Sequence, residues 1–293
     1  MATLALLSSV LVPLRTPLLH ALRHRVPPSP LSLMVDYEAV RADTVAEVAD
    51  FFVESFWLSS TTFDSVALSE REQSQLRRRM EDDFITRYSS SWTAGGQRLF
   101  RSKMLIAREN RTSAAIVGCV GFEAALYDAV AGCVLTSAQA DVLLRLEIDA
   151  MDSAERMHAT ELHKAGGIAA LSQAIFPEYQ PIALIANLAV SPSSRGTGIG
   201  CQLCSSCEIG CAQWRLPGLV LQVEESNSAA RSMYKRLGYE EVHSESMAEA
   251  LRLRPGRGSL TSALLMTDSE NLLESVPSTI VTMAKEVPSQ NFD

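Results

Sequence analysis

The sequence of 293 residues lacks several features that would place it in a specialised class of protein. It has no run of about 18 consecutive apolar residues, the length that a membrane-spanning helix requires. Glycine and cysteine are scarce, at 15 and 6 residues, so neither a collagen helix nor a disulfide-rich scaffold fits. Basic residues are also outnumbered, with 26 Lys and Arg against 34 Asp and Glu. Because nucleic-acid affinity depends on neutralising phosphates, such an acidic chain is not expected to bind DNA or RNA.

The first 34 residues contain no acidic residue, whereas arginine, histidine, proline and serine are all present; the first acid is Asp36. This composition predicts that residues 1–34 are a disordered organelle transit peptide, which directs the protein to the chloroplast, with the mitochondrion as the alternative. The apolar run 4–14 also allows a secretory signal, although no positive charge precedes it. A plain disordered tail is the third interpretation, and the prolines at 27, 28 and 30 suit it equally well.

The rest of the chain has the composition of an ordinary globular protein, since hydrophobic residues make up 47% and charged residues 20% of the whole. Hydrophobic periodicity predicts the order β, α, α, β, β, a mixed segment, β, α, β, α and further β. That order indicates a mixed α/β fold, with a central sheet of about six to seven strands and helices on both faces. One domain is expected over 35–287, with an insertion at about 127–178, a last strand over 279–284 and a tail over 288–293.

Two local patterns stand out within these predicted elements. The helix expected over 69–88 carries three arginines at 77–79 and three acids at 81–83, one turn apart. Such runs are typical of a solvated face with weak ion pairs, not of a binding patch. In the strand expected over 114–124, Gly118 and Gly121 indicate a bulge or a close approach of another chain segment.

Three glycines lie where a buried strand over 182–190 is expected to pass into a helix. The segment 195–200 reads Arg-Gly-Thr-Gly-Ile-Gly. Glycine allows backbone N–H groups to converge on one point and lets a phosphate approach closely. The N-terminus of the following helix favours an anion as well. The loop therefore predicts a phosphate-bearing ligand, with a simple tight turn as the alternative.

Two common phosphate loops do not fit this segment. A P-loop needs Lys followed by Ser or Thr after its last glycine, and here Cys201 and Gln202 follow. The dinucleotide fingerprint needs Gly or Ala where Cys201 stands. Glu224, at the end of the next predicted strand, lies about where a ribose-binding acid would be, which keeps a nicotinamide cofactor as a minor alternative.

Three motifs follow one another between about 182 and 243: Leu188-Ala189-Val190, Arg195-x-x-Gly198-x-Gly200, and Asn227-x6-Tyr234-x3-Gly238-Tyr239. Together they resemble the acetyl-CoA-binding core of the GNAT superfamily of N-acetyltransferases. The resemblance implies a GNAT-type sheet and acetyl transfer from acetyl-CoA to a primary amine. The residues at 187–190, 207–208 and 283–285 are similar to those of plastid members that acetylate protein lysines and N-termini. Protein or peptide amines are thus the expected substrates, and a small arylalkylamine is the alternative.

The resemblance also implies a role for each position of the motifs. The backbone at 188–190 would lie along the pantetheine and supply an N–H to the oxyanion, and the N–H groups at 196–201 would hold the pyrophosphate. Tyr234 would protonate the departing thiolate, unless its ring is simply part of the core. The implied acetyl-CoA contacts are Leu188, Ala189, Val190, Arg195, Gly196, Thr197, Gly198, Ile199, Gly200, Cys201, Asn227 and Tyr234.

The sequence leaves the proton acceptor of this reaction open. A lysine amine, with a pKa of about 10.4, is mostly protonated at neutral pH, so a proton has to be removed before attack. Many relatives carry a Glu five residues before the Asn of the third motif, but here that position is Gln222, which cannot act as a base. Glu224, Glu123 and water all remain candidates.

Four cysteines offer a competing interpretation: Cys201, Cys204, Cys207 and Cys211 have the spacing of an iron–sulfur run. The run lacks the following proline, and its glycine start and helical periodicity favour a helix whose thiols face the sheet. Core packing is therefore expected. An iron–sulfur or zinc redox protein is the alternative from another class, and redox-sensitive thiols are a further one.

Overall fold

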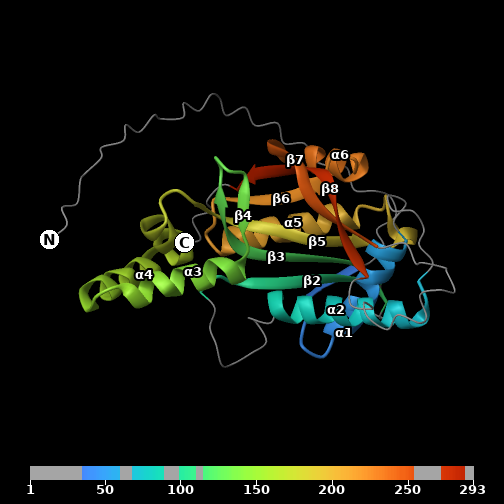
Figure 1. Cartoon of the computed structure of the whole chain (residues 1–293), viewed down its shortest axis with the longest axis horizontal. Helices are drawn as coiled ribbons and strands as arrows, with labels where there is room; N and C mark the ends of the chain where they lie inside the picture. Colours follow the sequence, from blue (N-terminus) through green and yellow to red (C-terminus); the bar gives the residue numbers. More distant parts are fainter. Residues whose placement is uncertain (1–34, 60–67, 89–98, 110–114, 254–271, 288–293) are drawn as a thin grey trace, which may run out of the picture.

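The computed structural model describes residues 35–59, 68–88, 99–109, 115–253 and 272–287 (Figure 1). The predicted transit segment 1–34 and the predicted tail 288–293 lie outside these residues. Within the described part of the chain, no helix combines the length and hydrophobicity of a membrane span.

A mixed sheet of eight strands forms the centre of the molecule. Its strands are β1 (Val35–Ala39), β2 (Ser102–Glu109), β3 (Ile116–Asp128), β4 (Cys133–Leu135), β5 (Gln180–Val190), β6 (Gly218–Glu224), β7 (Glu240–Leu253) and β8 (Leu273–Glu286). They follow the order β1-β2-β3-β5-β6-β8-β7, and β4 pairs with β3 off this path. β5 and β6 are parallel, and the other pairs are antiparallel. The predicted mixed α/β fold is confirmed, with more strands than the six to seven expected.

The helices of the described part are α1 (Val45–Phe52), which continues as the π-helix η1 (Val53–Leu58), α2 (Glu70–Tyr88), α3 (Ser137–Ala150), α4 (Ser153–Ile175), α5 (Ile199–Gln213) and α6 (Ser228–Arg236). A single 3-10 turn, η3 (Pro192–Ser194), precedes α5. α6 ends where predicted, because Gly238 adopts the left-handed backbone conformation, with φ of 87°.

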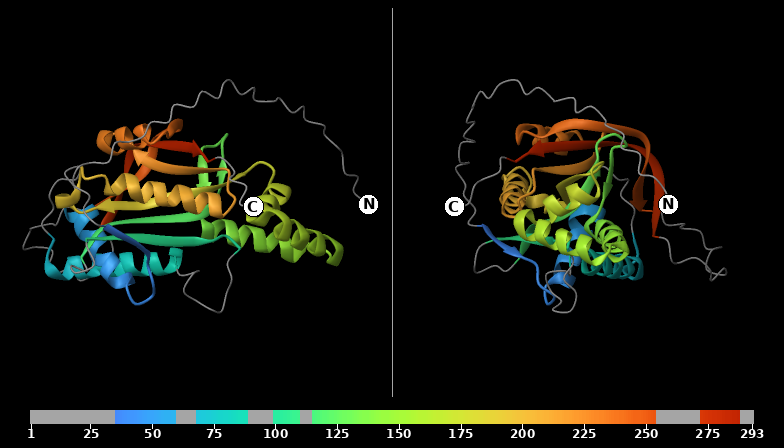
Figure 2. Two further views of the ribbon diagram at one scale, coloured as in Figure 1. Left: turned by 180° about the vertical axis from the view of Figure 1, so that it is seen from behind. Right: turned by 90° about the vertical axis from the view of Figure 1, so that its left-hand side faces the viewer.

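Two hydrophobic layers cover opposite faces of the sheet, because side chains alternate along a strand. On one face, Val120 and Phe122 of β3 pack with Leu203 of α5. On the other face, Cys119 and Ile106 join the layer of α1, η1 and α2. In Figure 2, α5 lies in front of the strands when the molecule is seen from behind, and α1 and α2 run below them. The helices therefore cover both faces, as predicted.

The cysteines of α5 occupy the core, as the helical periodicity predicts. Cys204, Cys207 and Cys211 are buried, whereas Cys201 is half-buried at the start of the helix. Burial raises the pKa of Cys204 and of Cys211 to about 12, so both thiols stay protonated. No group of three or more His, Cys, Asp or Glu residues in the described part is arranged to hold a metal ion.

The segment 127–178, whose role the sequence left open, forms β4, α3 and α4. The two helices extend past one end of the sheet (Figure 1). Asp152 caps α4, since its side chain accepts hydrogen bonds from Ala154 N and Glu155 N. Leu144 and Leu171 contribute to the core on the α5 face. The segment therefore enlarges the core.

β8 is longer than the strand predicted over 279–284, since it begins at Leu273. The residues before 279 include serines and a proline, which are uncommon in strands, so the hydrophobic pattern does not indicate the first part of β8. β6 pairs with β8 from Ile280 onward, so Pro277 has only β7 beside it, paired at Glu249. At such an edge, a strand tolerates a proline that cannot donate a hydrogen bond. β7 and β8 thus form a long ribbon that extends beyond β6.

Candidate active site

A cleft opens where β5 and β6 separate. The two parallel strands pair over Ala183–Ile185 and Leu219–Leu221, although β5 continues to Val190 and β6 to Glu224. The cavity at this opening has a volume of about 970 Å³. The carboxyl ends of neighbouring parallel strands are a usual place for a ligand in an α/β fold.

The cleft gathers the residues that the sequence motifs singled out. Those that line it are Leu188, Ala189, Val190, Arg195, Gly196, Gly198, Ile199, Gly200, Cys201, Asn227 and Tyr234. Thr197 is the exception, because its hydroxyl donates to the carbonyl of Ser194 at 2.7 Å and its N–H donates to the same carbonyl at 3.4 Å. Those bonds stabilise the turn, which corrects the expectation that the Thr197 N–H is available to a phosphate.

A β-bulge shapes the first wall of the cleft. Cys119 pairs with Ala189 and Gly121 with Ala186, so two residues of β5 face Val120 alone. One of them, Asn187, has a φ of 53°, and its side-chain amide donates to the hydroxyl of Tyr88 at 2.9 Å. A bulge leaves backbone groups out of the strand ladder. The backbone at 188–190 therefore has the local geometry to offer an N–H to a ligand.

The glycines of β3 explain how α2 and α5 come so close to this bulge. A Cβ on Gly121 would lie 2.0 Å from the Tyr88 hydroxyl, and one on Gly118 would lie 2.9 Å from Ile199. Neither position leaves room for a side chain. The predicted close approach is confirmed, and β3 carries a bulge of its own, because Gly118 pairs with Ala107 and Ile116 with Arg108, which leaves Val117 between them.

The glycine loop forms the second wall, and it has the shape that a phosphate needs. Gly196 and Gly198 have φ angles of 79° and 94°, in the left-handed region that favours glycine. A Cβ on either would meet no atom within 4 Å, so the loop faces open space there. α5 begins at Ile199, directly after the loop. Free backbone N–H groups at a helix N-terminus suit the diphosphate of a coenzyme A.

Arg195 is more than a free positive charge beside this loop. Its guanidinium donates to the carbonyl of Ser55 in η1 at 2.8 Å and to the carbonyl of Val190 at 3.2 Å. Asn227 likewise has a structural role, because its side chain caps α6 by accepting from Ala230 N at 3.1 Å. Both residues line the cleft while holding its walls in place.

Tyr234 lies on α6 and is buried, with 7% of its surface exposed. Its ring contacts that of Tyr239, with 5.8 Å between centroids, so the ring packs in the core. It also lines the cleft, and its hydroxyl makes no hydrogen bond to any residue that the structure describes. Burial raises the pKa of Tyr234 well above the ordinary value. The phenol therefore keeps its proton at neutral pH and is available as a donor.

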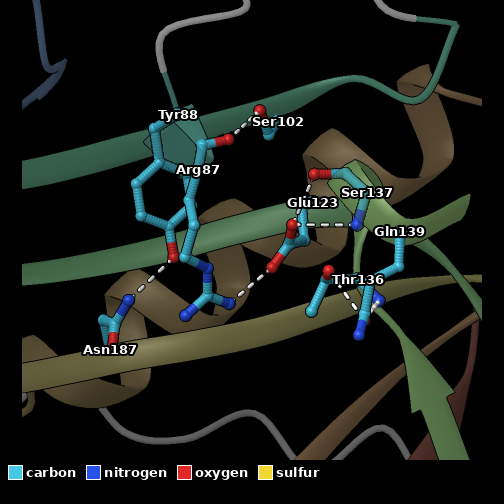
Figure 3. A network of polar contacts seen from close by, with 8 residues as sticks. All are labelled: Arg87, Tyr88, Ser102, Glu123, Thr136, Ser137, Gln139 and Asn187. Carbon is cyan, nitrogen blue, oxygen red and sulfur yellow. Dashed lines mark hydrogen bonds and ion pairs between the residues drawn. The ribbon is translucent and has the colours of Figure 1, made fainter. Parts of the chain in front are cut away.

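The two carboxylates considered from sequence are both held by other groups. Glu224 lines the cleft but forms an ion pair with Arg252, at 2.8 Å for one oxygen, and its other oxygen accepts from Ser278 at 3.3 Å. Glu123 is wholly buried and accepts from Arg87 at 2.5 Å and from Ser137 N at 3.0 Å. Figure 3 shows Arg87 and Ser137 converging on the Glu123 carboxylate. Neither acid is available to a substrate.

The opposite wall of the cleft comes from residues that the sequence did not single out. It consists of the end of α1, η1, α2 and the β7–β8 ribbon. Its residues are Phe52, Ser55, Phe56, Trp57, Arg79, Met80, Asp83, Arg87, Glu249, Ala250, Leu251 and Leu273. The expectation of a solvated face on α2 is correct for Arg77, which pairs with Glu54 at 2.9 Å. Arg79 is exposed as well, as expected, but it also lines the cleft together with the half-buried Asp83. One sequence signal could have linked these residues. Positions 79, 83 and 87 are four residues apart, which places them on one face of the helix.

Comparison with known proteins shows which protein family this part of the chain resembles. Residues 155–241, from within α4 to the start of β7, match the family model described as an acetyltransferase (GNAT) domain. No curated protein matches the chain. The chain carries a GNAT acetyltransferase domain; it is an acetyltransferase, and acetyl-CoA is its co-substrate.

Several solved acetyltransferase structures are similar to this chain. NAA60 of Arabidopsis thaliana, in complex with acetyl-CoA, is 11% identical, with a TM-score of 0.43 over 86% of this chain and 98% of that one. Naa20 of Chaetomium thermophilum, in complex with a bisubstrate analogue, is 14% identical, with a TM-score of 0.45 over 87% of each chain. The ribosomal-protein-S18-alanine N-acetyltransferase of Escherichia coli is 11% identical, with a TM-score of 0.43 over 89% and 98%. At these TM-scores none of the three bears on the substrate of this chain.

Proposed function

We propose that this acetyltransferase acts on protein amines, either lysine side chains or N-terminal α-amines. The observation that carries the proposal is the two-walled cleft. One wall holds the glycine loop and the bulge of β5, and the other is built from η1, α2 and the β7–β8 ribbon. At about 970 Å³, the cleft is at the upper end of the range for small-molecule sites, which leaves room for a segment of chain beside the pantetheine arm.

The residues of the cleft fit direct attack by an amine. Acetyl-CoA supplies an activated acetyl group as a thioester. The backbone at 188–190 would orient the acetyl carbonyl and donate to its oxygen as negative charge develops there. The N–H groups of the glycine loop and of the first turn of α5 would hold the diphosphate. Tyr234 would give its proton to the departing sulfur.

One feature favours a second candidate, a small arylalkylamine. Phe52, Phe56 and Trp57 bring aromatic rings to the acceptor wall, and the Phe52 and Phe56 rings are stacked with 4.9 Å between centroids. Such a surface would suit a flat aromatic amine as well as an apolar side chain of a peptide.

A competition experiment separates the two candidates. The purified full chain is incubated with acetyl-CoA and an equimolar mixture of three acceptors: a peptide whose only amine is its N-terminus, a peptide with one lysine and a blocked N-terminus, and tryptamine. Mass spectrometry then counts the acetylated products. We expect a peptide product to dominate by at least about tenfold in initial rate, since binding across the second wall adds interactions that tryptamine lacks. Preferential acetylation of tryptamine would overturn the proposal.

The composition of residues 1–34 supports a plastid location as part of the same proposal. A fluorescent fusion of the full chain should enter chloroplasts, whereas a fusion of residues 35–293 should not. Entry into mitochondria would assign the alternative organelle, and identical distribution of both fusions would exclude a targeting role for the segment.

A further inference from the structure

We propose that Asp83 of α2 accepts a proton from the acceptor ammonium, so that the neutral amine can attack the thioester. The inference rests on the acetyl-transfer reaction and deepens the proposed function, but it holds for any amine acceptor. The sequence motifs gave no candidate on this helix. The structure does, because it brings α2 to the acceptor side of the cleft, opposite the glycine loop.

Elimination points to Asp83 first. The carboxylates that line the cleft are Asp83, Glu224 and Glu249. Glu224 is held by Arg252 and Ser278, as described above. Glu249 is exposed on the β7–β8 ribbon. None of the histidines in the described part of the chain lines the cleft. Asp83 is therefore the half-buried carboxylate that faces the cleft without a bound partner.

The surroundings of Asp83 keep it available. Its carboxylate makes no hydrogen bond and no ion pair with any residue that the structure describes, although Arg79 and Arg87 lie one turn away on either side. The Arg87 guanidinium is directed to the buried Glu123 instead, at 2.5 Å (Figure 3). The guanidinium is therefore bonded to Glu123 and not to Asp83, although its positive charge still acts on Asp83. The Glu123–Arg87 pair thus has a consequence for the cleft as well as for stability.

The position of α2 brings Asp83 near the place where the acetyl group is expected. The end of this helix is fixed to the bulge of β5, because Tyr88 accepts a hydrogen bond from Asn187 at 2.9 Å (Figure 3). Leu188 follows directly, and the backbone at 188–190 lines the cleft together with Asp83. The carboxylate is thus on the opposite wall from Tyr234 on α6, so that a proton can be accepted at one wall and donated at the other.

The electrostatic environment favours proton acceptance. Burial raises the pKa of Asp83 above that of an exposed aspartate, and the negative charge of Glu123 raises it further. Arg87 and Arg79 act in the opposite direction without reversing the shift. A carboxylate with a raised pKa is a stronger base than one in water, which is the change that general-base catalysis needs.

The proton balance of the step is as follows for an acceptor that arrives as an ammonium. Asp83 takes one proton from the nitrogen, directly or through one water, and later releases it to solvent. The neutral nitrogen forms the new C–N bond, the C–S bond breaks, and the thiolate takes a proton from Tyr234. The second nitrogen proton passes through water to restore the Tyr234 phenol. One proton is released per acetyl group transferred.

The test compares Asp83→Asn with Asp82→Asn, its exposed neighbour on the same helix. Steady-state rates are measured on the full chain with whichever acceptor the wild type acetylates fastest: a peptide, tryptamine or the amines of the chain itself. The failure of peptides as substrates would therefore overturn the proposed function without affecting this test. We expect Asp83→Asn to lower kcat about 100-fold and to leave acetyl-CoA affinity within twofold, whereas Asp82→Asn changes neither.

The pH dependence distinguishes proton transfer from a structural role. In Asp83→Asn, the residual rate should rise about tenfold per pH unit below the pKa of the amine, because only free amine reacts. The wild-type rate should rise less steeply over the same range. Asp83→Glu should recover part of kcat. Added formate should raise the activity of Asp83→Ala and leave the activity of the wild type unchanged. These two readouts hold even if Asp83→Asn proves unstable in thermal melting.

Several results would overturn the inference. One is a kcat for Asp83→Asn within twofold of the wild type, and another is a higher acceptor KM at unchanged kcat, which would make Asp83 an anchor for the ammonium. The inference would also be overturned if the rate of Asp83→Asn rose with pH as steeply as the rate of the wild type. Loss of activity in Glu249→Gln with full activity in Asp83→Asn would move the role to the β7–β8 ribbon.

Discussion

The two walls of the cleft are built in different ways. The wall that is expected to hold acetyl-CoA comes from a nearly continuous stretch of sequence, from the bulge of β5 through the glycine loop to Tyr234 on α6. The opposite wall combines η1, α2 and the β7–β8 ribbon, which lie far apart in the sequence. A shared cofactor needs a constant local geometry, whereas an acceptor wall made of separate parts can vary element by element. The variants below test how independent the two walls are.

The largest effect is expected from the glycine loop. Gly198→Glu places a side chain where φ is 94° and a negative charge where a diphosphate would bind. We expect acetyl-CoA affinity to fall by about 1,000-fold in titration calorimetry, since backbone strain and charge repulsion act together.

Gly167→Glu is the matched control, because Gly167 also has a positive φ, of 68°, and also faces open space, but lies in α4 away from the cleft. It should carry the same backbone strain without affecting acetyl-CoA binding. If both variants bind the co-substrate normally, the glycine loop is a structural turn and not a phosphate site.

The next effect concerns stability under the acceptor wall. Glu123→Ala leaves Arg87 without its buried partner, and removing one member of a buried ion pair is strongly destabilising. The free energy of unfolding should fall by about 3 kcal/mol in urea denaturation. Glu161→Ala, which breaks the exposed pair with Lys164, should change it by less than about 1 kcal/mol. Similar values for the two variants would contradict the account of Glu123.

Tyr234→Phe tests the proton donor on the cofactor wall. It removes one hydroxyl from a buried ring that otherwise stays in place, so stability and acetyl-CoA binding should be retained. We expect kcat to fall about 50-fold, because an assisting acid contributes up to a few powers of ten. Burial raises the pKa of Tyr234, so the wild type should show no loss of rate from ionisation of this phenol between pH 8 and pH 10. Normal turnover by the variant would remove Tyr234 from the reaction.

The smallest effect is in the core beneath the cofactor wall. Burial raises the pKa of Cys204 and Cys211 to about 12, above the ordinary thiol value near 9. A folded pKa that is raised gives stability that is complete below the unfolded pKa and is lost as the pH rises through the folded one. The free energy of unfolding should therefore fall from about pH 9 upward, by about 1.4 kcal/mol per pH unit for each thiol. Cys211→Ala should reduce this slope, and an unchanged slope would show that other groups dominate.

The difference between the walls also explains what the sequence could predict. The mixed fold, the core role of the cysteines and the glycine loop follow from local patterns, because a glycine turn, a buried strand and a helix are short-range features. The other residues of the cofactor wall were implied by the resemblance of the three motifs to the GNAT superfamily. Gly118 and Gly121 indicated the irregularity of their own strand β3, but the bulge at Asn187 on the adjacent strand was not predicted.

Long-range arrangement limits prediction of the acceptor wall. The four-residue spacing places Asp83 on one face of α2 with Arg79 and Arg87, but nothing local shows that this face meets the cleft until Tyr88 anchors the helix on the sheet. The structural role of Arg195 was likewise hidden, because it depends on the carbonyl of Ser55, which is distant in the sequence, whereas the cap that Asn227 forms on α6 is a local contact. The start of β8 was missed because a proline argues against a strand that is paired on both sides. Pro277 is tolerated because β6 does not pair with β8 before Ile280, and the sequence alone does not show this.

Arg195 connects the two walls in a way that affects the energetics of binding. Its guanidinium is already fixed by the carbonyls of Ser55 and Val190, and an arginine retains further N–H donors when two are in use. An anion that reaches the loop therefore meets a charge whose rotational freedom has been lost during folding, so little side-chain entropy remains to be lost on association. Arg195→Lys would keep the charge but not this immobilisation, because an ammonium has no planar fork with which to bridge two carbonyls.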